Sequence, residues 1–244
     1  MTSHLPQAIL LDLDDTILAF DSVAEPCWRR VCLDFCTQLP GVSAGALHEA
    51  IRESRAHYWQ DPERHRQGRL NLRAARQEVV AAALRRLGVD APRLAAEIAA
   101  AYAQAREAAI HPLPGAIETV RDLRRRGVRL GLLTNGTGEE QRGKIDRFAL
   151  APLFDLILIE GEFGAGKPDA RVYRHALQAL GVEPAATWMV GDNLEWDVLA
   201  PQGLGITGIW VDAAGQGVPA GSPARPDRIV RSLNELVCTA EGDR

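Results

Sequence analysis

The sequence predicts an α/β fold in which a doubly wound parallel sheet carries an inserted all-helical domain. Short apolar segments alternate with helical segments from residue 112 onward, and one further apolar segment, AILLDL, stands alone near the start. Between them, residues 21–111 have apolar residues at helical spacing and no comparable strand signal. Strands that are separated by helices need crossover connections, and these favour a parallel sheet with helices on both faces.

The first predicted strand, AILLDL, is apolar at nearly every position, which is typical of a strand buried on both faces of a parallel sheet. Helices are expected to begin at Asp61-Pro62 and at Asp90-Ala91-Pro92, where an acidic residue precedes a proline. The stiff sequence HPLPG, residues 111–115, then ends the helical block. We therefore expect a core of residues 1–20 and 112–244 and a helical domain of residues 21–111.

Helices and strands alternate through the rest of the chain. In order, we predict a helix over 116–126, the strand VRLGLLT, a helix over 139–148, the strand LILI, a helix over about 169–180, the strand TWMV, a helix from about residue 194, the strand ITGIWV, and a last short strand and helix after Asp227.

Composition and charge exclude several classes of protein. The chain has 244 residues, of which 46% are hydrophobic and 25% charged, a balance that is typical of soluble globular proteins and not of disordered chains. The net charge of -4 predicts no basic surface for a nucleic acid polymer. The apolar stretch near the start ends at Asp12, too soon for a signal peptide or a membrane span. We therefore expect neither a nucleic acid partner nor a membrane partner.

Four cysteines, Cys27, Cys32, Cys36 and Cys238, are too few for a disulfide scaffold. Three of them share one predicted helix, and their spacing is not a common zinc pattern. We interpret them as buried, reduced thiols, which is typical of proteins in the cytoplasm. The sequence is thus expected to belong to a cytoplasmic protein. Its expected oligomeric state is a monomer or a homodimer.

Polar clusters stand where the predicted strands end, and ligands of an open parallel sheet gather beyond the carboxyl ends of its strands. The clusters are Asp12-Leu13-Asp14-Asp15-Thr16 after the first strand, Thr134-Asn135-Gly136 after the second, Gly191-Asp192-Asn193 with Asp197 after TWMV, and Lys167-Pro168-Asp169 after LILI and a glycine-rich loop. We expect these four clusters to form one site.

Such a site would concentrate negative charge, because it would hold the carboxylates of Asp12, Asp14, Asp192 and Asp197. Like charges so close together are unfavourable unless a cation neutralises them. A cluster of oxygen ligands with room for water and for a phosphate suits Mg²⁺. The sequence therefore predicts a magnesium site.

The remaining polar residues of these clusters suit a phosphate group. Lys167 would add a positive charge, and Thr134 with the amides around Asn135 and Gly136 would donate hydrogen bonds to phosphate oxygens. Of the 28 basic residues only Lys144 and Lys167 are lysine, so the choice of lysine at position 167 indicates that a compact ammonium group is needed there. Together these residues indicate phosphoryl transfer.

The four clusters resemble the motifs of the haloacid dehalogenase superfamily. They read DLDDT, LLTNG, GKPD and GDNLEWD, and they occur in the order of that family, with a helical insertion between the first two. The resemblance covers nearly the whole chain. It implies a Rossmann-like core with an inserted helical cap.

The resemblance also implies roles for individual residues. Asp12 would be the nucleophile that forms an aspartyl-phosphate, and Asp14 would act as acid and then as base. Mg²⁺ would be held by the carboxylate of Asp12, by the main-chain carbonyl of Asp14 and by Asp192, with Asp197 helping directly or through water. Thr134 and Lys167 would hold the phosphoryl group. The implied function is that of a Mg²⁺-dependent phosphatase that hydrolyses a small-molecule phosphate monoester of the nucleotide or sugar phosphate type.

Other functions remain open at this point. The segment GEFGAGK has the spacing of a P-loop, but Pro168 stands where a hydroxyl should reach the metal. Asp14 argues against a dehalogenase, and the absence of lysine from residues 22–110 argues against a phosphonate hydrolase that forms a Schiff base. A phosphosugar mutase resembling β-phosphoglucomutase and a catalytically idle binding or regulatory relative remain as alternatives.

Substrate selection is expected in the helical insertion. An aromatic surface there could stack on a base or sugar, and an arginine could pair with a second anionic group. The candidates are Phe20, Asp21, Trp28, His57, Tyr58, Trp59, Arg64, His65, Arg66 and Arg69. The DLDDT and FDS segments are similar to those of small-metabolite phosphatases of the pyrimidine nucleotidase and N-acylneuraminate phosphatase kinds.

Overall fold

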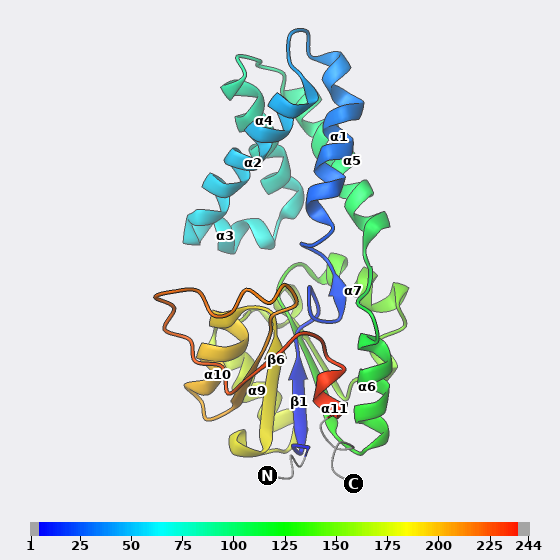
Figure 1. The fold of residues 1–244 in the computed structure, drawn as a ribbon, viewed down its shortest axis with the longest axis vertical. Helices are drawn as coiled ribbons and strands as arrows, with labels where there is room; N and C mark the ends of the chain where they lie inside the picture. The colour runs from blue at the N-terminus through cyan, green and yellow to red at the C-terminus, as the bar shows by residue number, and fades with distance from the viewer. Residues whose placement is uncertain (1–4, 239–244) are drawn as a thin grey trace. The chain divides into compact units, whose positions relative to one another are not determined.

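The computed structural model describes residues 5–238 and divides the chain into two compact units (Figure 1). One unit joins Met1–Ala19 to His111–Arg244, and the other is Phe20–Ile110. The first unit contains the sheet and the second consists of helices.

The first unit is built on a six-stranded sheet in which every neighbouring pair of strands is parallel. Its strands are β1 (Ala8–Leu11), β4 (Arg129–Thr134), β5 (Leu156–Ile159), β6 (Thr187–Gly191), β7 (Thr207–Val211) and β8 (Arg228–Val230). The order in the sheet is β5-β4-β1-β6-β7-β8, so the chain winds outward from β1 first in one direction and then in the other. This doubly wound sheet confirms the predicted α/β fold class.

Helices cover both faces of this sheet. They are α6 (Ala116–Arg125), α7 (Gly138–Arg147), α8 (Glu160–Phe163), α9 (Ala170–Leu180), α10 (Ala200–Gln202), α11 (Glu235–Cys238), the 3-10 turns η2 (Ala151–Leu153) and η3 (Pro184–Ala186), and the π-helix η4 (Leu194–Leu199). Figure 1 shows α9 and α10 on one side of β1 and β6, with α6 and α11 on the other. All four residues of β1 are fully buried between these layers, which explains why that strand is continuously apolar.

Three features of this unit were not predicted. A two-residue strand, β2 (Leu18–Ala19), pairs antiparallel with β3 (His111–Pro112) where the chain leaves and re-enters the unit. The one-turn helix α8 occupies part of the expected glycine-rich loop after β5, and the helix expected from residue 194 begins as the π-helix η4. Such short elements leave no periodic signal in a sequence.

The second unit contains helices throughout, as predicted for this part of the chain. They are α1 (Ala24–Phe35), the 3-10 turn η1 (Cys36–Gln38), α2 (Ala44–Gln60), α3 (Pro62–Arg69), α4 (Leu72–Arg86) and α5 (Pro92–Ala109). Asp61 caps α3 as expected, because its carboxylate accepts the Arg64 N–H at 2.8 Å. At the start of α5, however, the capping position is Ala91 and not the expected Asp90, and no side chain accepts a hydrogen bond there.

The core of the helical unit is partly aromatic. Trp28 and Tyr102 stack with ring centroids 3.6 Å apart, and both side chains are buried. Cys27 and Cys32 are buried in the same core, and burial raises the pKa of the Cys32 thiol to about 12. Cys27, Cys32 and Cys36 are free thiols in the described part of the chain, whereas the side chain of Cys238 lies outside it.

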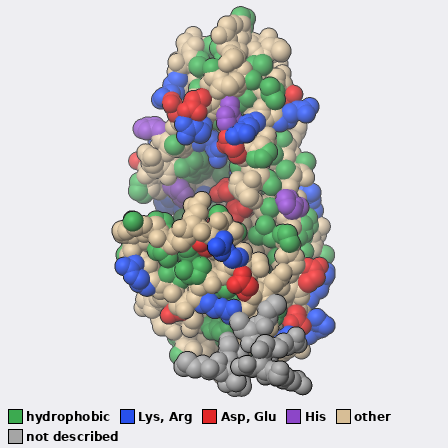
Figure 2. Space-filling view, viewed as in Figure 1, with side chains coloured by type: hydrophobic (Ala, Val, Ile, Leu, Met, Phe, Trp, Pro, Cys, Tyr) green, Lys and Arg blue, Asp and Glu red, His purple; other side chains and the backbone are tan. Residues whose placement is uncertain are grey.

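The surface carries mixed charge. On the face shown in Figure 2, basic and acidic side chains are interspersed, in keeping with the small net charge. Within residues 5–238, none of the helices is both long enough and apolar enough to span a membrane.

Candidate active site

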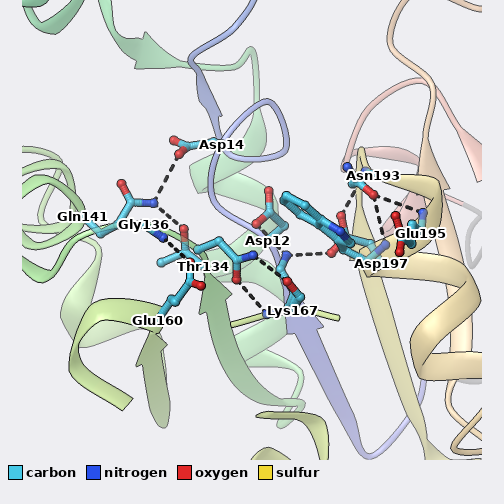
Figure 3. Close-up of polar contacts among 12 residues, drawn as sticks. Asp12, Asp14, Thr134, Gly136, Gln141, Glu160, Lys167, Asn193, Glu195 and Asp197 are labelled. Carbon is cyan, nitrogen blue, oxygen red and sulfur yellow. Dashed lines mark hydrogen bonds and ion pairs between the residues drawn. The ribbon is translucent and has the colours of Figure 1, made fainter. Parts of the chain in front are cut away.

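The predicted site residues meet at the carboxyl ends of the central strands in the sheet unit (Figure 3). Asp12 directly follows β1, Thr134 is the last residue of β4, and Asp192 directly follows β6. Asp197 lies in η4, and Lys167 lies in the loop between α8 and α9. Because β4, β1 and β6 are neighbours in the sheet, their ends bring these side chains to one place.

Lys167 forms the centre of a buried ion-pair network. Its Nζ lies 2.8 Å from Oδ1 of Asp12 and 2.6 Å from Oδ1 of Asp197. The lysine is 1% exposed and Asp197 is 0% exposed. Burial alone would lower the pKa of Lys167, but the two carboxylates outweigh it and hold that pKa above its usual value. The lysine is therefore a permanently charged group at the end of β1.

A group of three carboxylates surrounds the end of β1. Oxygen atoms of Asp12, Asp192 and Asp197 all lie within 4.8 Å of one another. Burial, followed by repulsion from Asp197 and Asp14, raises the pKa of Asp12 to about 7 against the opposing effect of Lys167. Desolvation and the charges of Asp12 and Asp197 raise the pKa of Asp192 to about 9.

These raised pKa values indicate that Lys167 does not fully compensate the negative charge of the cluster. The donor set consists of carboxylate oxygens, one of them on an exposed residue that leaves room for water and substrate. Small hard cations such as Mg²⁺ prefer such oxygen ligands. The residues present therefore fit a Mg²⁺ ion.

The position of Asp197 follows from the local backbone. Its Oδ2 accepts the Asn193 N–H at 3.0 Å, while the Asn193 side chain caps η4 by accepting the N–H groups of Glu195 and Trp196. Gly191 gives Asp197 its space, because a Cβ at position 191 would lie 2.2 Å from Oδ2 of Asp197. The glycine of GDNLEWD is thus required by close packing.

Asn135 and Gly136 have roles in the structure that the sequence did not predict. The side chain of Asn135 accepts the Lys167 N–H at 2.8 Å and donates to the Lys167 carbonyl at 2.7 Å, so it ties the lysine loop to the end of β4. The Gly136 N–H donates to Oε2 of the buried Glu160 at 3.1 Å. Phosphate binding by the amides of this loop stays a prediction.

A tight turn after β1 positions Asp14. Asp15 has φ of 53°, in the left-handed region that Asp tolerates better than most residues. Its N–H donates to the Leu18 carbonyl at 2.7 Å, and the Leu18 N–H in turn donates to the Leu13 carbonyl at 3.0 Å. This turn directs the Asp14 side chain away from Asp12 and Asp197 and toward Gln141 of α7 (Figure 3).

Two residues of α7 that the sequence analysis did not select complete the site. Lys144 Nζ lies 2.8 Å from Oδ1 and 2.7 Å from Oδ2 of Asp14. The amide nitrogen of Gln141 donates to Asp14 at 3.2 Å and also to Oγ1 of Thr134. The scarcity of lysine, which drew attention to Lys167, applies equally to Lys144 and would have identified it.

Five of the candidates named in the helical unit have structural roles there. Trp28 and Tyr58 are buried in its core, and Arg66 pairs with Glu63 at the surface. Phe20 and Asp21 both contact Arg106, which the sequence analysis did not select. The Arg106 guanidinium carbon lies 3.5 Å from the centre of the Phe20 ring, and its Nη2 lies 2.6 Å from Oδ1 of Asp21.

Comparison with known proteins identifies the relatives of this chain. It is 36% identical to a phosphoserine phosphatase of Thermus thermophilus over 93% of this chain and 96% of that protein. It is 29% identical to the pyrimidine 5'-nucleotidase YjjG of Escherichia coli over 93% and 95% of the two chains. The crystal structure of the HAD-hydrolase YfnB of Bacillus subtilis bound to magnesium has a TM-score of 0.75 at 21% identity, covering 98% of this chain and 100% of that one.

The family assignment rests on most of the chain. Residues 6–205 match the family described as haloacid dehalogenase-like hydrolase, and this range contains all four predicted motifs. The expected resemblance is thereby confirmed. This protein belongs to the haloacid dehalogenase-like hydrolases and is an enzyme of the hydrolase class.

Proposed function

We propose that the protein is a Mg²⁺-dependent phosphatase that hydrolyses a small-molecule phosphate monoester through an aspartyl-phosphate on Asp12. The observation that carries the proposal is the placement of Asp12 at the end of β1, 2.8 Å from the Lys167 ammonium and within the carboxylate cluster. The similarity to proteins named as a phosphoserine phosphatase and a nucleotidase supports the same reaction class.

The residues of the site suit a two-step reaction. In the first step an Asp12 carboxylate oxygen attacks phosphorus, the bond from phosphorus to the leaving oxygen breaks, and the Asp14 carboxyl group protonates that oxygen. In the second step Asp14 takes a proton from water as the water oxygen attacks phosphorus and releases Asp12. Lys167 and Thr134 would hold the phosphoryl oxygens during both steps.

Mg²⁺ would be held by three carboxylates and one main-chain carbonyl. The carboxylates are those of Asp12, Asp192 and Asp197, and the carbonyl is that of Asp14. When bound, the ion supplies positive charge that neutralises phosphate oxygens and the carboxylates around them. Lys167 provides the second cation, and its pairing with both Asp12 and Asp197 keeps these carboxylates oriented.

The proposal extends to the helical unit and to the cellular setting. We propose that residues 21–111 form a cap that selects the leaving group, since they are inserted between the first and second motifs. The free thiols of Cys27, Cys32 and Cys36 support a cytoplasmic location.

The test is phosphate release from phosphoserine, nucleoside monophosphates, sugar phosphates and an aryl phosphate, with Mg²⁺ and with EDTA. We expect release that requires Mg²⁺ and that falls more than about a thousandfold in Asp12→Asn, because the nucleophile is removed. Asp34→Asn is the matched control, since Asp34 is an exposed residue of α1 that pairs with Arg30.

The control variant is expected to keep full activity, and circular dichroism should show both variants folded. Substantial turnover by purified Asp12→Asn would contradict the assignment of the nucleophile. Absence of release from every ester by the folded wild-type protein with Mg²⁺ would contradict the proposed phosphatase function.

A further inference from the structure

Asp14 is held by side chains that come from a single face of α7. Lys144 contacts both carboxylate oxygens of Asp14, and Gln141 donates to one of them. Lys144 is 8% exposed and Gln141 is 2% exposed, so neither side chain is a solvated surface group. Contact of one ammonium group with both oxygens turns the open edge of the carboxylate toward Lys144, and the hydrogen bond from Gln141 restrains it from a second point.

Every atom of α7 in these contacts is a hydrogen-bond donor to Asp14. An ammonium group has only hydrogen-bond donors, and the atom of Gln141 that faces Asp14 is its amide nitrogen, also a donor. When Asp14 carries a proton, its O–H therefore finds no acceptor among these atoms of α7. The Asp14 side chain is 22% exposed, so such an O–H can point away from these atoms, toward solvent or a substrate.

Gln141 connects this arrangement to the phosphate-holding part of the site. Its amide nitrogen also donates to Oγ1 of Thr134, at the end of β4 (Figure 3). One helix face thus fixes Asp14 relative to Thr134. Residues 141, 144 and 145 share that face, and Ile145 anchors it by being fully buried.

The use of lysine supports a specific role at position 144. The chain has 28 basic residues, and its two lysines contact the site carboxylates in both cases: Lys167 contacts Asp12 and Asp197, and Lys144 contacts Asp14. Elsewhere on α7 the basic residues are arginine, and Arg142 pairs with Glu162 across an exposed surface. An ammonium group is a compact point charge, and here a single nitrogen atom lies 2.7–2.8 Å from both oxygens of the Asp14 carboxylate.

We propose that Lys144 is a positioning residue that aims the Asp14 proton at the leaving oxygen. The inference rests on the proposed phosphatase function. In the step concerned, the proton passes from Asp14 to the leaving oxygen as the bond from that oxygen to phosphorus breaks and the bond from Asp12 to phosphorus forms. Lys144 donates no proton in this step and keeps its ammonium group throughout.

The test compares two esters with different needs for the acid. A dinitrophenyl phosphate expels a stable anion, whereas an alkyl phosphate must have its leaving oxygen protonated. The quantity to measure is kcat/KM, because it reports the steps up to phosphoryl transfer and not the later hydrolysis of the intermediate. In Lys144→Met, we expect kcat/KM to fall about 10- to 100-fold for the alkyl phosphate and less than about threefold for the aryl phosphate.

Two further variants separate positioning from simple packing. Lys144→Arg keeps a donor-only cation, so the ratio of the two kcat/KM values should stay within about threefold of the wild-type ratio. Lys144→Gln removes the charge and introduces an acceptor for the Asp14 O–H, so the selective loss should persist. This variant also decides the matter if Lys144→Met does not fold. Arg147→Met, on the exposed side of α7, is the control and should leave both esters unaffected.

The outcomes distinguish the inference from the function on which it rests. An equal loss for both esters in folded Lys144→Met or Lys144→Gln, or no loss for either, would overturn the positioning role. Mg²⁺-dependent activity of the wild-type protein would still support the phosphatase in that case. A folded wild-type protein without activity on either ester would overturn the proposed function itself, and the positioning role with it.

Discussion

At the scale of single residues, the stability of the site depends on Lys167. Its ammonium group is buried together with Asp197 and next to Asp12, so the charges have little water around them. Removing one partner of a buried ion pair leaves a charge without compensation, and this is more unfavourable than losing an exposed pair. The lysine therefore stabilises the fold as well as the proposed reaction.

We predict that Lys167→Met lowers the free energy of unfolding by about 3–5 kcal/mol in EDTA, because it leaves the buried Asp197 carboxylate without its cation. Arg171→Met is the matched control, since Arg171 pairs with Asp169 at a similar distance of 2.7 Å but on an exposed surface. Its effect should stay below about 1 kcal/mol. Urea denaturation measures both, and equal effects of the two substitutions would contradict the prediction.

Single residues of the site were predictable where the end of a strand fixes them. Asp12, Thr134 and Asp192 lie at the ends of adjacent parallel strands, so an apolar run followed by a polar cluster was sufficient. Lys144 and Gln141 lie on α7, whose sequence GEEQRGKIDR reads as a solvated helix. Which of its polar residues face inward depends on how the helix is rotated against the sheet, and Ile145 is the main apolar guide to that rotation.

At the scale of elements, the loop and π-helix after β6 are the most closely fitted part of the site. Gly191 ends β6, and the space next to its Cα is filled by the Asp197 carboxylate. The structure holds Asp197 there through Asn193 and Lys167. A side chain at position 191 must therefore displace a charged group from its partners.

We predict that Gly191→Ala abolishes Mg²⁺-dependent activity and lowers stability, because its Cβ would meet Oδ2 and Cγ of Asp197 at 2.2 and 2.3 Å. Gly143→Ala is the matched control, since a Cβ in this exposed position of α7 meets nothing within 4 Å. Alanine is the better helix former, so this control should raise the free energy of unfolding by about 0.5–1 kcal/mol.

Activity assays and urea denaturation of the two alanine variants provide the measurement. Full activity in Gly191→Ala would show that Asp197 can move without consequence, contrary to the prediction. A loss of stability in Gly143→Ala would show that the backbone of α7 has a restraint at that position that the structure does not reveal.

Most elements were predictable because they are long or strongly apolar. The strands LILI and TWMV and the helix α9 begin or end within a residue or so of their predicted bounds. The pairing of β2 with β3 was not predictable, since Leu18–Ala19 and His111–Pro112 are two residues each and far apart in sequence. The missing cap at Asp90 shows that an acidic residue before a proline does not by itself determine which residue precedes the first turn.

The crowded carboxylates link the stability of the entire protein to pH and to metal binding. In an unfolded chain, the pKa of an aspartate side chain is about 3.9. In the folded, metal-free protein Asp12 keeps its proton to about pH 7 and Asp192 to about pH 9. Between about pH 4 and about pH 9 the folded state therefore binds more protons than the unfolded state. The free energy of unfolding consequently falls as the pH rises through this range.

We predict that the melting temperature in EDTA decreases between about pH 5.5 and about pH 8.5, and that the increase produced by Mg²⁺ becomes larger over the same range. Protons and Mg²⁺ compete for the same carboxylates, so the ion binds best when they are ionised. Differential scanning fluorimetry in EDTA and in excess Mg²⁺ measures both curves. A Mg²⁺ effect that is absent, or that is the same at both ends of the range, would contradict the prediction. Asp34→Asn is the control, because Asp34 is exposed and far from the carboxylate cluster in sequence. It should leave the melting temperatures in EDTA and in Mg²⁺ unchanged.

The burial of both lysines has a practical consequence for chemical labelling. Reagents that acylate lysine side chains need an uncharged, accessible amine, and Lys144 and Lys167 are 8% and 1% exposed and paired with carboxylates. Acylation of either lysine in the native protein must therefore wait until the site opens locally. Because the chain has no other lysine to contribute a background, the rate of lysine acylation measured by mass spectrometry would report the opening of this site alone.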